Sequence, residues 1–119
     1  MRIGPIDLQK EILIIAEIGN NHEGSLAAAE EMIGLAAKAG AGAVKFQTIV
    51  PEKLISANEK QRIEQLRRFQ LSYADFEKLS RAAACEKVLF LSFFLMKGQE
   101  ISFTISYWRA NERCDSSGF

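Results

Sequence analysis

The sequence predicts an α/β fold in which a parallel sheet is built from about three strand–helix units. The short apolar run at residues 12–16 is typical of a strand that is buried on both faces, and residues 43–47 and 88–92 are predicted to form a second and a third strand. Stretches with helical periodicity lie between them, and strands that alternate with helices form βαβ units. A doubly wound open sheet and a (βα)8 barrel both fit this alternation, and periodicity alone does not separate them.

Three helices are expected between and after these strands. The first begins at Ser25, a residue type that caps helices, and ends at Gly40. A second helix is predicted over residues 59–69, and the capping-box spacing of Ser72 and Asp75 predicts the start of a third. The side chains expected to face the core are Leu26, Ile33, Ala36, Ala37, Ile63, Leu66, Phe69, Phe76, Leu79 and Ala83.

Composition excludes several classes of protein. Fifteen basic and fifteen acidic residues cancel among 119 residues, so no overall field attracts nucleic acid or an anionic membrane. The longest apolar stretch, residues 88–96, is too short to cross a bilayer, and the charged residues near the amino terminus exclude a signal peptide. We therefore expect a cytoplasmic protein in which Cys85 and Cys114 are reduced thiols.

Polar residues follow or end the predicted strands, where α/β folds bind their ligands. These residues are Glu17, Lys45, Gln47 and Ser92. Because side chains alternate along a strand, Lys45 and Gln47 share one face, and burying them is costly unless they line a polar cavity. A lysine beside a carboxylate there can bind an anionic substrate and activate a water. Alternatively, Lys45 is a snorkelling or ion-paired lysine with Glu17 as its structural partner.

The loop after the first predicted strand contains one histidine and two glycines. His22 is interpreted as a residue that hydrogen-bonds within the loop, because a single histidine is too little for a metal site. Gly19 and Gly24 do not fit the dinucleotide or P-loop patterns, so both are interpreted as turn glycines.

Two motifs carry a family resemblance. Residues 15–25 read IAEIGNNHEGS, and residues 39–48 read AGAGAVKFQT. Both resemble signatures of the N-acetylneuraminate (sialic acid) synthase family, in the family's order and at its separation, and the resemblance covers residues 12–92. It implies an incomplete (βα)8 TIM barrel of about three βα units.

The resemblance also implies a reaction. Family members condense phosphoenolpyruvate with an N-acylated amino sugar of the N-acetylmannosamine type and water, giving a nine-carbon 2-keto acid and phosphate. By analogy Lys45 binds the phosphoenolpyruvate anion, Gln47 contacts the acylamino sugar, Glu17 holds the attacking water or the reacting carbonyl, and Ser92 lies near the phosphoenolpyruvate pocket. A divalent metal (Mn or Mg) and a homodimer are implied for the intact enzyme, with the metal ligands outside this chain.

The resemblance ends after Ser92. The family pattern continues with Thr-Pro-Phe, whereas this chain has Phe93 and then an unmatched tail over residues 93–119 with one candidate strand at residues 101–108. A frameshift would explain the change, and resequencing the gene would test it. We expect the chain alone to be inactive and poorly soluble. The alternatives are a non-catalytic remnant or interaction module, or another phosphoenolpyruvate-condensing sugar-acid synthase.

Overall fold

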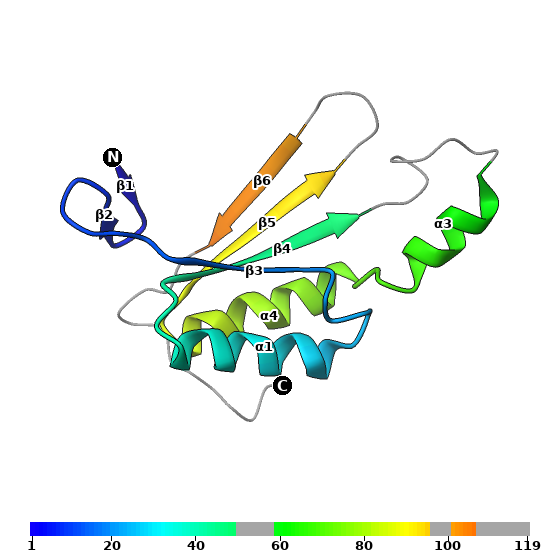
Figure 1. Ribbon diagram of the computed structural model, residues 1–119, viewed down its shortest axis with the longest axis horizontal. Helices are drawn as coiled ribbons and strands as arrows, with labels where there is room; N and C mark the ends of the chain where they lie inside the picture. The colour runs from blue at the N-terminus through cyan, green and yellow to red at the C-terminus, as the bar shows by residue number, and fades with distance from the viewer. Residues whose placement is uncertain (50–58, 96–100, 107–119) are drawn as a thin grey trace.

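The computed structural model describes residues 1–49, 59–95 and 101–106, and these form an α/β fold with a largely parallel sheet (Figure 1). The elements, in chain order, are β1 (Arg2–Ile3), β2 (Ile6–Asp7), β3 (Ile15–Gly19), α1 (Leu26–Lys38), β4 (Ala43–Ile49), α3 (Lys60–Arg67), α4 (Tyr73–Cys85), β5 (Leu89–Leu95) and β6 (Ile101–Ser106). None of the described helices is long and apolar enough to cross a membrane.

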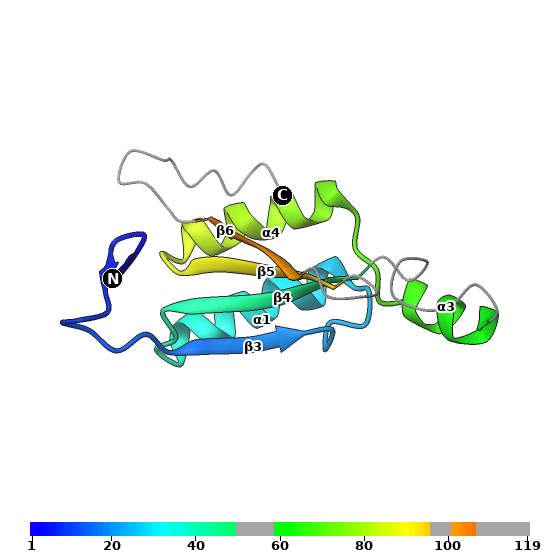
Figure 2. The same ribbon diagram turned by 90° about the horizontal axis from the view of Figure 1, so that it is seen from above.

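The main sheet has the strand order β3-β4-β5-β6. The first three strands are parallel, and β6 pairs with β5 in the antiparallel direction. Helices α1 and α4 pack together on one face of the sheet (Figures 1 and 2). Doubly wound sheets carry helices on both faces, so the described residues do not have that arrangement. The four described strands of this sheet do not close into a barrel.

The main core lies between the sheet and the two helices. Phe46 and Phe90 project from the sheet with ring centroids 5.4 Å apart. Ile33 of α1 and the α4 residues Leu79 and Ala83 are fully buried against them, which confirms the helix faces predicted from periodicity. Burial of each large apolar side chain stabilises the fold by about 1.5–3 kcal/mol, so this layer holds the strands in register.

The predicted starts of the first and third helices are confirmed by their caps, whereas α3 is shorter than the predicted helix over residues 59–69 and its N-cap residue makes no side-chain cap hydrogen bond. Ser25 Oγ accepts a hydrogen bond from the Ala28 N–H at 3.1 Å, which starts α1. Ser72 and Asp75 form the reciprocal capping box at 3.1 and 3.2 Å, which starts α4. Gly40, just past the end of α1, has φ of +95°, a conformation that glycine adopts without strain.

The prediction of a first strand at residues 12–16, buried on both faces, is wrong. Strand β3 begins at Ile15, and the Ile12 side chain is 92% exposed. The reason is that β3 lies at the edge of the sheet, with no described strand on its outer side. The third predicted strand was correctly placed but is longer, since β5 continues to Leu95.

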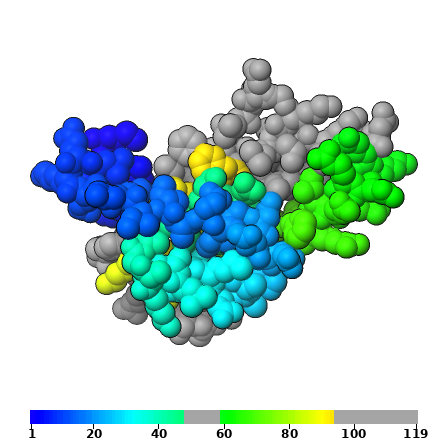
Figure 3. Space-filling view, viewed as in Figure 1, coloured from blue at the N-terminus to red at the C-terminus, as the bar shows by residue number. Residues whose placement is uncertain are grey.

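A hairpin that the sequence reading missed lies at the amino end of the sheet. Ile3 pairs with Ile6 across a turn formed by Gly4 and Pro5, a dipeptide that marks turns. Ile3, Ile6 and Leu13 pack against a second apolar cluster formed by Ala43, Leu89 and Leu91. The hairpin and α3 lie at opposite ends of the molecule (Figure 3). The hairpin therefore covers the amino ends of the strands.

Two expectations for the last part of the chain are also corrected or narrowed. The candidate strand at residues 101–108 is confirmed as β6 for residues 101–106, and the last two residues lie outside the described ranges.

Cys85 is disulfide-bonded, so the expectation of reduced thiols is wrong for this residue. The spacing of cysteines in the sequence does not report which thiols the fold brings together. Cys114 lies outside the described residues.

Candidate functional site

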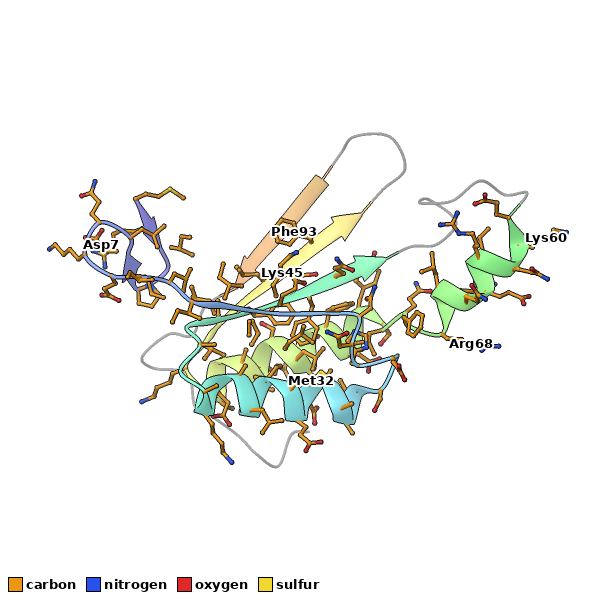
Figure 4. All side chains as sticks on the ribbon, viewed as in Figure 1. Asp7, Met32, Lys45, Lys60, Arg68 and Phe93 are labelled. Atoms are coloured by element: carbon orange, nitrogen blue, oxygen red, sulfur yellow. The ribbon has the colours of Figure 1, made fainter. Side chains whose placement is uncertain are left out.

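The face of the sheet opposite the helices, here called the open face, carries two polar residues predicted for the site, Lys45 and Gln47. Val44 and Phe46 belong to the core on the helix side, so Lys45 and Gln47 project to the open face, as the alternation of side chains predicts. Figure 4 shows Lys45 beside Phe93, on the side of the sheet away from α1 and α4. The carboxyl half of the open face therefore carries polar side chains beside Phe93, whereas its amino half is apolar.

Lys45 is held between a carboxylate and an aromatic ring. Its Nζ lies 2.8 Å from Glu17 Oε2 and 4.3 Å from the centroid of the Phe93 ring. Glu17 and Lys45 are register partners on β3 and β4. The Lys45 side chain is 23% exposed and that of Glu17 is 54% exposed, so the pair contributes only about 0–1 kcal/mol to folding. The ammonium is thus partly buried, with the more exposed Glu17 carboxylate on one side and the Phe93 ring on the other.

Gln47 extends the site toward the carboxyl end of β4. Asn20, in the loop after β3, donates a hydrogen bond through Nδ2 to Gln47 Oε1 at 3.1 Å. The sequence analysis did not predict Asn20 as a site residue. The signal that could have identified it is its position directly after a strand, at the end of the sheet where such folds bind ligands. Glu17, Asn20, Lys45 and Gln47 are called the polar cluster below.

Gly19 lets the backbone approach the polar cluster. Its φ is +56°, and the pairing register of β3 shifts between Glu17 and Gly19, which indicates a bulge. A Cβ at this position would lie 3.3 Å from Glu17 Oε1 and 4.0 Å from Gln47 Cδ. Gly19 was predicted as a turn glycine, but it ends β3 at this bulge, and its missing side chain leaves room for Glu17 and Gln47.

The His22 side chain is buried beside Phe46 and does not belong to the polar cluster. It is only 2% exposed, its ring centroid lies 6.0 Å from that of Phe46, and its Nδ1 accepts a hydrogen bond from the Gly24 N–H at 3.0 Å. Burial lowers the pKa of His22, and the nearby Gly19 backbone opposes this shift more weakly. The neutral ring is favoured, so its interpretation as a loop hydrogen-bonder is confirmed.

The structure does not bring Ser92 to the polar cluster. On β5 the neighbouring Phe90 packs into the helix-side core, while Leu91 packs with the apolar cluster of the open face. By alternation Ser92, which is buried, points to the helix side, and Phe93 takes the position beside Lys45. Ser92 and Lys45 thus lie on opposite faces of the sheet, and the place of Ser92 near a phosphoenolpyruvate pocket stays a prediction.

Among residues 1–49, 59–95 and 101–106, no three His, Cys, Asp or Glu side chains come together in a way that could hold a metal ion. The polar cluster contributes one carboxylate, and that carboxylate is already paired with Lys45. These residues therefore do not fit a divalent-metal site by themselves.

The comparisons with known proteins establish the family to which this chain belongs. The sequence model of the NeuB family matches residues 32–107, which is more than half of the chain. The chain belongs to the NeuB family. The match includes Lys45 and Gln47 and extends beyond Ser92, where the resemblance of the motifs ends.

Individual relatives narrow the class to sugar-acid synthases. The chain is 44% identical over 61 residues to a pseudaminic acid synthase of Campylobacter jejuni, covering 51% of this chain and 18% of the relative. It is 34% identical over 106 residues to an N,N'-diacetyllegionaminic acid synthase of Legionella pneumophila, covering 78% and 30%. A solved structure, the N-acetylneuraminic acid (sialic acid) synthetase of Leptospira borgpetersenii, is similar with a TM-score of 0.65 and 31% identity, covering 71% and 29%. The chain spans less than a third of each of these proteins.

Proposed function

We propose that this chain provides the first strands of a (βα)8 barrel in an enzyme that condenses phosphoenolpyruvate with an N-acylated amino sugar. The observation that carries the proposal is the polar cluster, in which a lysine, a carboxylate and a carboxamide meet at the carboxyl ends of parallel strands. The one-sided packing of α1 and α4 supports the barrel, because barrel helices all lie outside the sheet.

Three residues of the polar cluster have a proposed task. The Lys45 ammonium binds the phosphoenolpyruvate anion as a point charge, and Glu17 holds the attacking water or the reacting carbonyl. Gln47 contacts the acylamino group, since a carboxamide both donates and accepts hydrogen bonds. No task is proposed for Ser92, because it points to the helix side of β5.

The proposed reaction joins three reactants. A carbon–carbon bond forms between the methylene carbon of phosphoenolpyruvate and the carbonyl carbon of the sugar, water adds to the neighbouring carbon, and inorganic phosphate leaves. A six-carbon amino sugar then gives a nine-carbon 2-keto acid. We propose a divalent metal, Mn or Mg, for the intact enzyme, but the described residues do not form its site and no step is derived through it.

The 119 residues alone are not expected to complete this reaction, because the proposal places the other substrate contacts outside them. A chimera therefore gives the direct test. Residues 1–92 would replace the matching segment of the Legionella pneumophila relative, and phosphate release from phosphoenolpyruvate would be measured with that relative's own sugar substrate. We expect turnover in the chimera and loss of turnover when Lys45→Met is introduced. A folded chimera whose turnover does not depend on Lys45 would refute the proposed role.

A second candidate function is favoured by one observation, the antiparallel pairing of β6 with β5. A barrel needs a parallel strand at this edge, whereas β6 occupies it in the antiparallel direction. We propose as the alternative that the chain is a self-contained, non-catalytic module. Sedimentation of the purified chain tests it: a stable monomer that binds no phosphoenolpyruvate supports the module, and saturable phosphoenolpyruvate binding contradicts it.

A further inference from the structure

The buried ring of His22 is held by a hydrogen bond that only its neutral form can make. Its Nδ1 accepts a hydrogen bond from the Gly24 N–H at 3.0 Å, and a backbone N–H can only donate, so Nδ1 carries no hydrogen. The hydrogen of the neutral ring is therefore on Nε2. This atom is buried, and among the described residues nothing accepts a hydrogen bond from it.

A protonated ring in this position has no acceptor at either nitrogen. Protonation adds a hydrogen to Nδ1, where it meets the Gly24 N–H, and leaves Nε2–H unpaired within the part of the chain that the structure describes. The side chain is almost fully buried, so bulk water does not solvate the added charge. Because a buried charge without a partner is costly, the imidazolium leaves this position and the bond to Gly24 is broken.

No charged side chain offsets the cost of protonating His22. The charged residues of the loop and of the segments around it are Glu17, Glu23, Glu30, Lys45, Arg68 and Asp75. Glu17 and Lys45 are paired with each other, and the Asp75 carboxylate caps α4. The pKa of His22 is lowered by burial and raised only by the Gly19 backbone, so none of these charged groups is among the causes of its shift.

The loop that His22 holds is the loop that carries Asn20. The Glu23 N–H donates to the Asn20 carbonyl and the Ser25 N–H donates to the His22 carbonyl, both at 3.0 Å. Glu23 and Gly24 have φ of +52° and +82°, and a non-glycine residue such as Glu23 keeps a positive φ only where its surroundings hold it there. The bond from Gly24 to His22 is one such restraint, so its loss lets the loop backbone move.

We propose that His22 is a positioning residue for the polar cluster, which keeps Asn20 against Gln47 when its ring is neutral and releases the loop when its ring is protonated. Asn20 makes the contact itself, at 3.1 Å, and His22 acts on it through the loop backbone. The inference concerns the geometry of the polar cluster and does not depend on what that cluster binds. It makes the arrangement of the polar cluster sensitive to pH.

The test follows the ¹⁵N-labelled 119-residue chain by NMR from about pH 7.5 to about pH 5, above the range in which carboxylates ordinarily titrate. The chain has one histidine, so the imidazole signals belong to His22. At the upper end we expect a hydrogen on Nε2 alone and a nuclear Overhauser contact between the side chains of Asn20 and Gln47. This contact should be lost with the same midpoint as the protonation of Nδ1, while the core residues Ile33 and Leu79 keep their folded signals.

Three variants separate the charge of the ring from its bulk. His22→Asn keeps an acceptor two residues before Gly24, as in Asx turns, but does not titrate, so the contact between Asn20 and Gln47 should persist at both ends of the pH range. His22→Phe keeps an apolar ring without an acceptor, and the contact should be absent at both ends. Glu23→Gln is the control, since it removes the other titratable group of the loop and should keep the wild-type pH dependence.

A contact between Asn20 and Gln47 that persists after protonation of His22 in the wild-type chain would overturn the inference, and this result requires no variant to fold. Loss of the whole fold in the same step, or a pH dependence that survives in His22→Asn, would also overturn it. None of these measurements uses phosphoenolpyruvate. Failure of the inference therefore leaves the proposed function untouched, and failure of phosphoenolpyruvate binding leaves the inference untouched.

Discussion

The two ends of the open face differ sharply although the same strands form both. At the amino end, Ala43, Leu89 and Leu91 are buried beneath the β1–β2 hairpin. Two and four residues further along β4, Lys45 and Gln47 form the polar cluster with residues of β3 and its loop. The amino end therefore contributes to stability, and the carboxyl end presents groups that can bind a ligand.

The largest expected effect is the loss of stability caused by a substitution at Gly24, which lies in the loop after β3 at the carboxyl end of the sheet. This residue has φ of +82°, and an added Cβ would overlap the backbone carbonyl of Arg68, which cannot move aside easily. We expect Gly24→Ala to lower the free energy of unfolding by about 3 kcal/mol or more, measured by urea denaturation. Gly34→Ala is the control, since nothing lies within 4 Å of its added Cβ inside α1, and it should stabilise the chain by up to about 1 kcal/mol.

The matching change at the amino end is Gly42→Ala. Its Cβ would lie 3.0 Å from Leu13 Cδ1, the end of a flexible side chain. We expect a cost of about 1 kcal/mol or less, because Leu13 can shift. Equal costs at Gly24 and Gly42 would contradict the claim that the carboxyl-end loop depends on a close backbone approach.

Substitution of Lys45 should lower the affinity for phosphoenolpyruvate and leave the free energy of unfolding almost unchanged. Lys45→Met removes the cation but keeps the length of the side chain, so we expect about tenfold or greater loss of phosphoenolpyruvate affinity by calorimetry. The free energy of unfolding should change by about 1 kcal/mol or less, because the pair with Glu17 is open to solvent. Unchanged affinity would support the alternative in which Lys45 is only an ion-paired structural lysine.

Substitution of Ile6 should have the opposite pattern. Ile6 is partly buried over the apolar cluster of the open face, and Ile6→Ala removes part of that cover. We expect about 1 kcal/mol of destabilisation in urea and no change in phosphoenolpyruvate affinity. A loss of affinity in this variant would show that the two ends of the open face are not independent.

The smallest expected effect is a dependence of stability on pH through His22. Burial lowers its pKa below the ordinary value of 6.5, so the unfolded chain binds the extra proton more readily than the folded chain. The contribution of the neutral ring is complete above the unfolded pKa and is lost as the pH falls through the folded pKa. Unfolding in urea from about pH 7.5 to about pH 5.5 should show this loss, and His22→Phe should lack that component.

Much of the fold could be predicted because its signals are local. The capping box of Ser72 and Asp75 and the apolar stripe through Ile33 depend on near neighbours in the sequence, and both were correct. The errors concern partners distant in the sequence. The position of β3 at the sheet edge, which leaves Ile12 exposed, and the disulfide at Cys85 are set by the assembled structure.

In the candidate site, too, local patterns were predicted correctly and contacts between distant residues were not. Alternation along β4 was enough to place Lys45 and Gln47 on one face and to expect Glu17 nearby. The same alternation along β5 places Ser92 on the helix side and Phe93 beside Lys45, but the sequence prediction did not use it. Asn20 was missed because its contact with Gln47 depends on the path of a loop, which no periodicity reports.

The most direct test of the central claim, that the carboxyl end of the open face binds an anionic substrate, is a titration of the ¹⁵N-labelled chain with phosphoenolpyruvate followed by NMR. The account predicts saturable shifts at Glu17, Lys45 and Gln47, with the hairpin residues Ile3 and Ile6 unchanged. Shifts confined to the hairpin, or no saturable shift at Lys45, would contradict it.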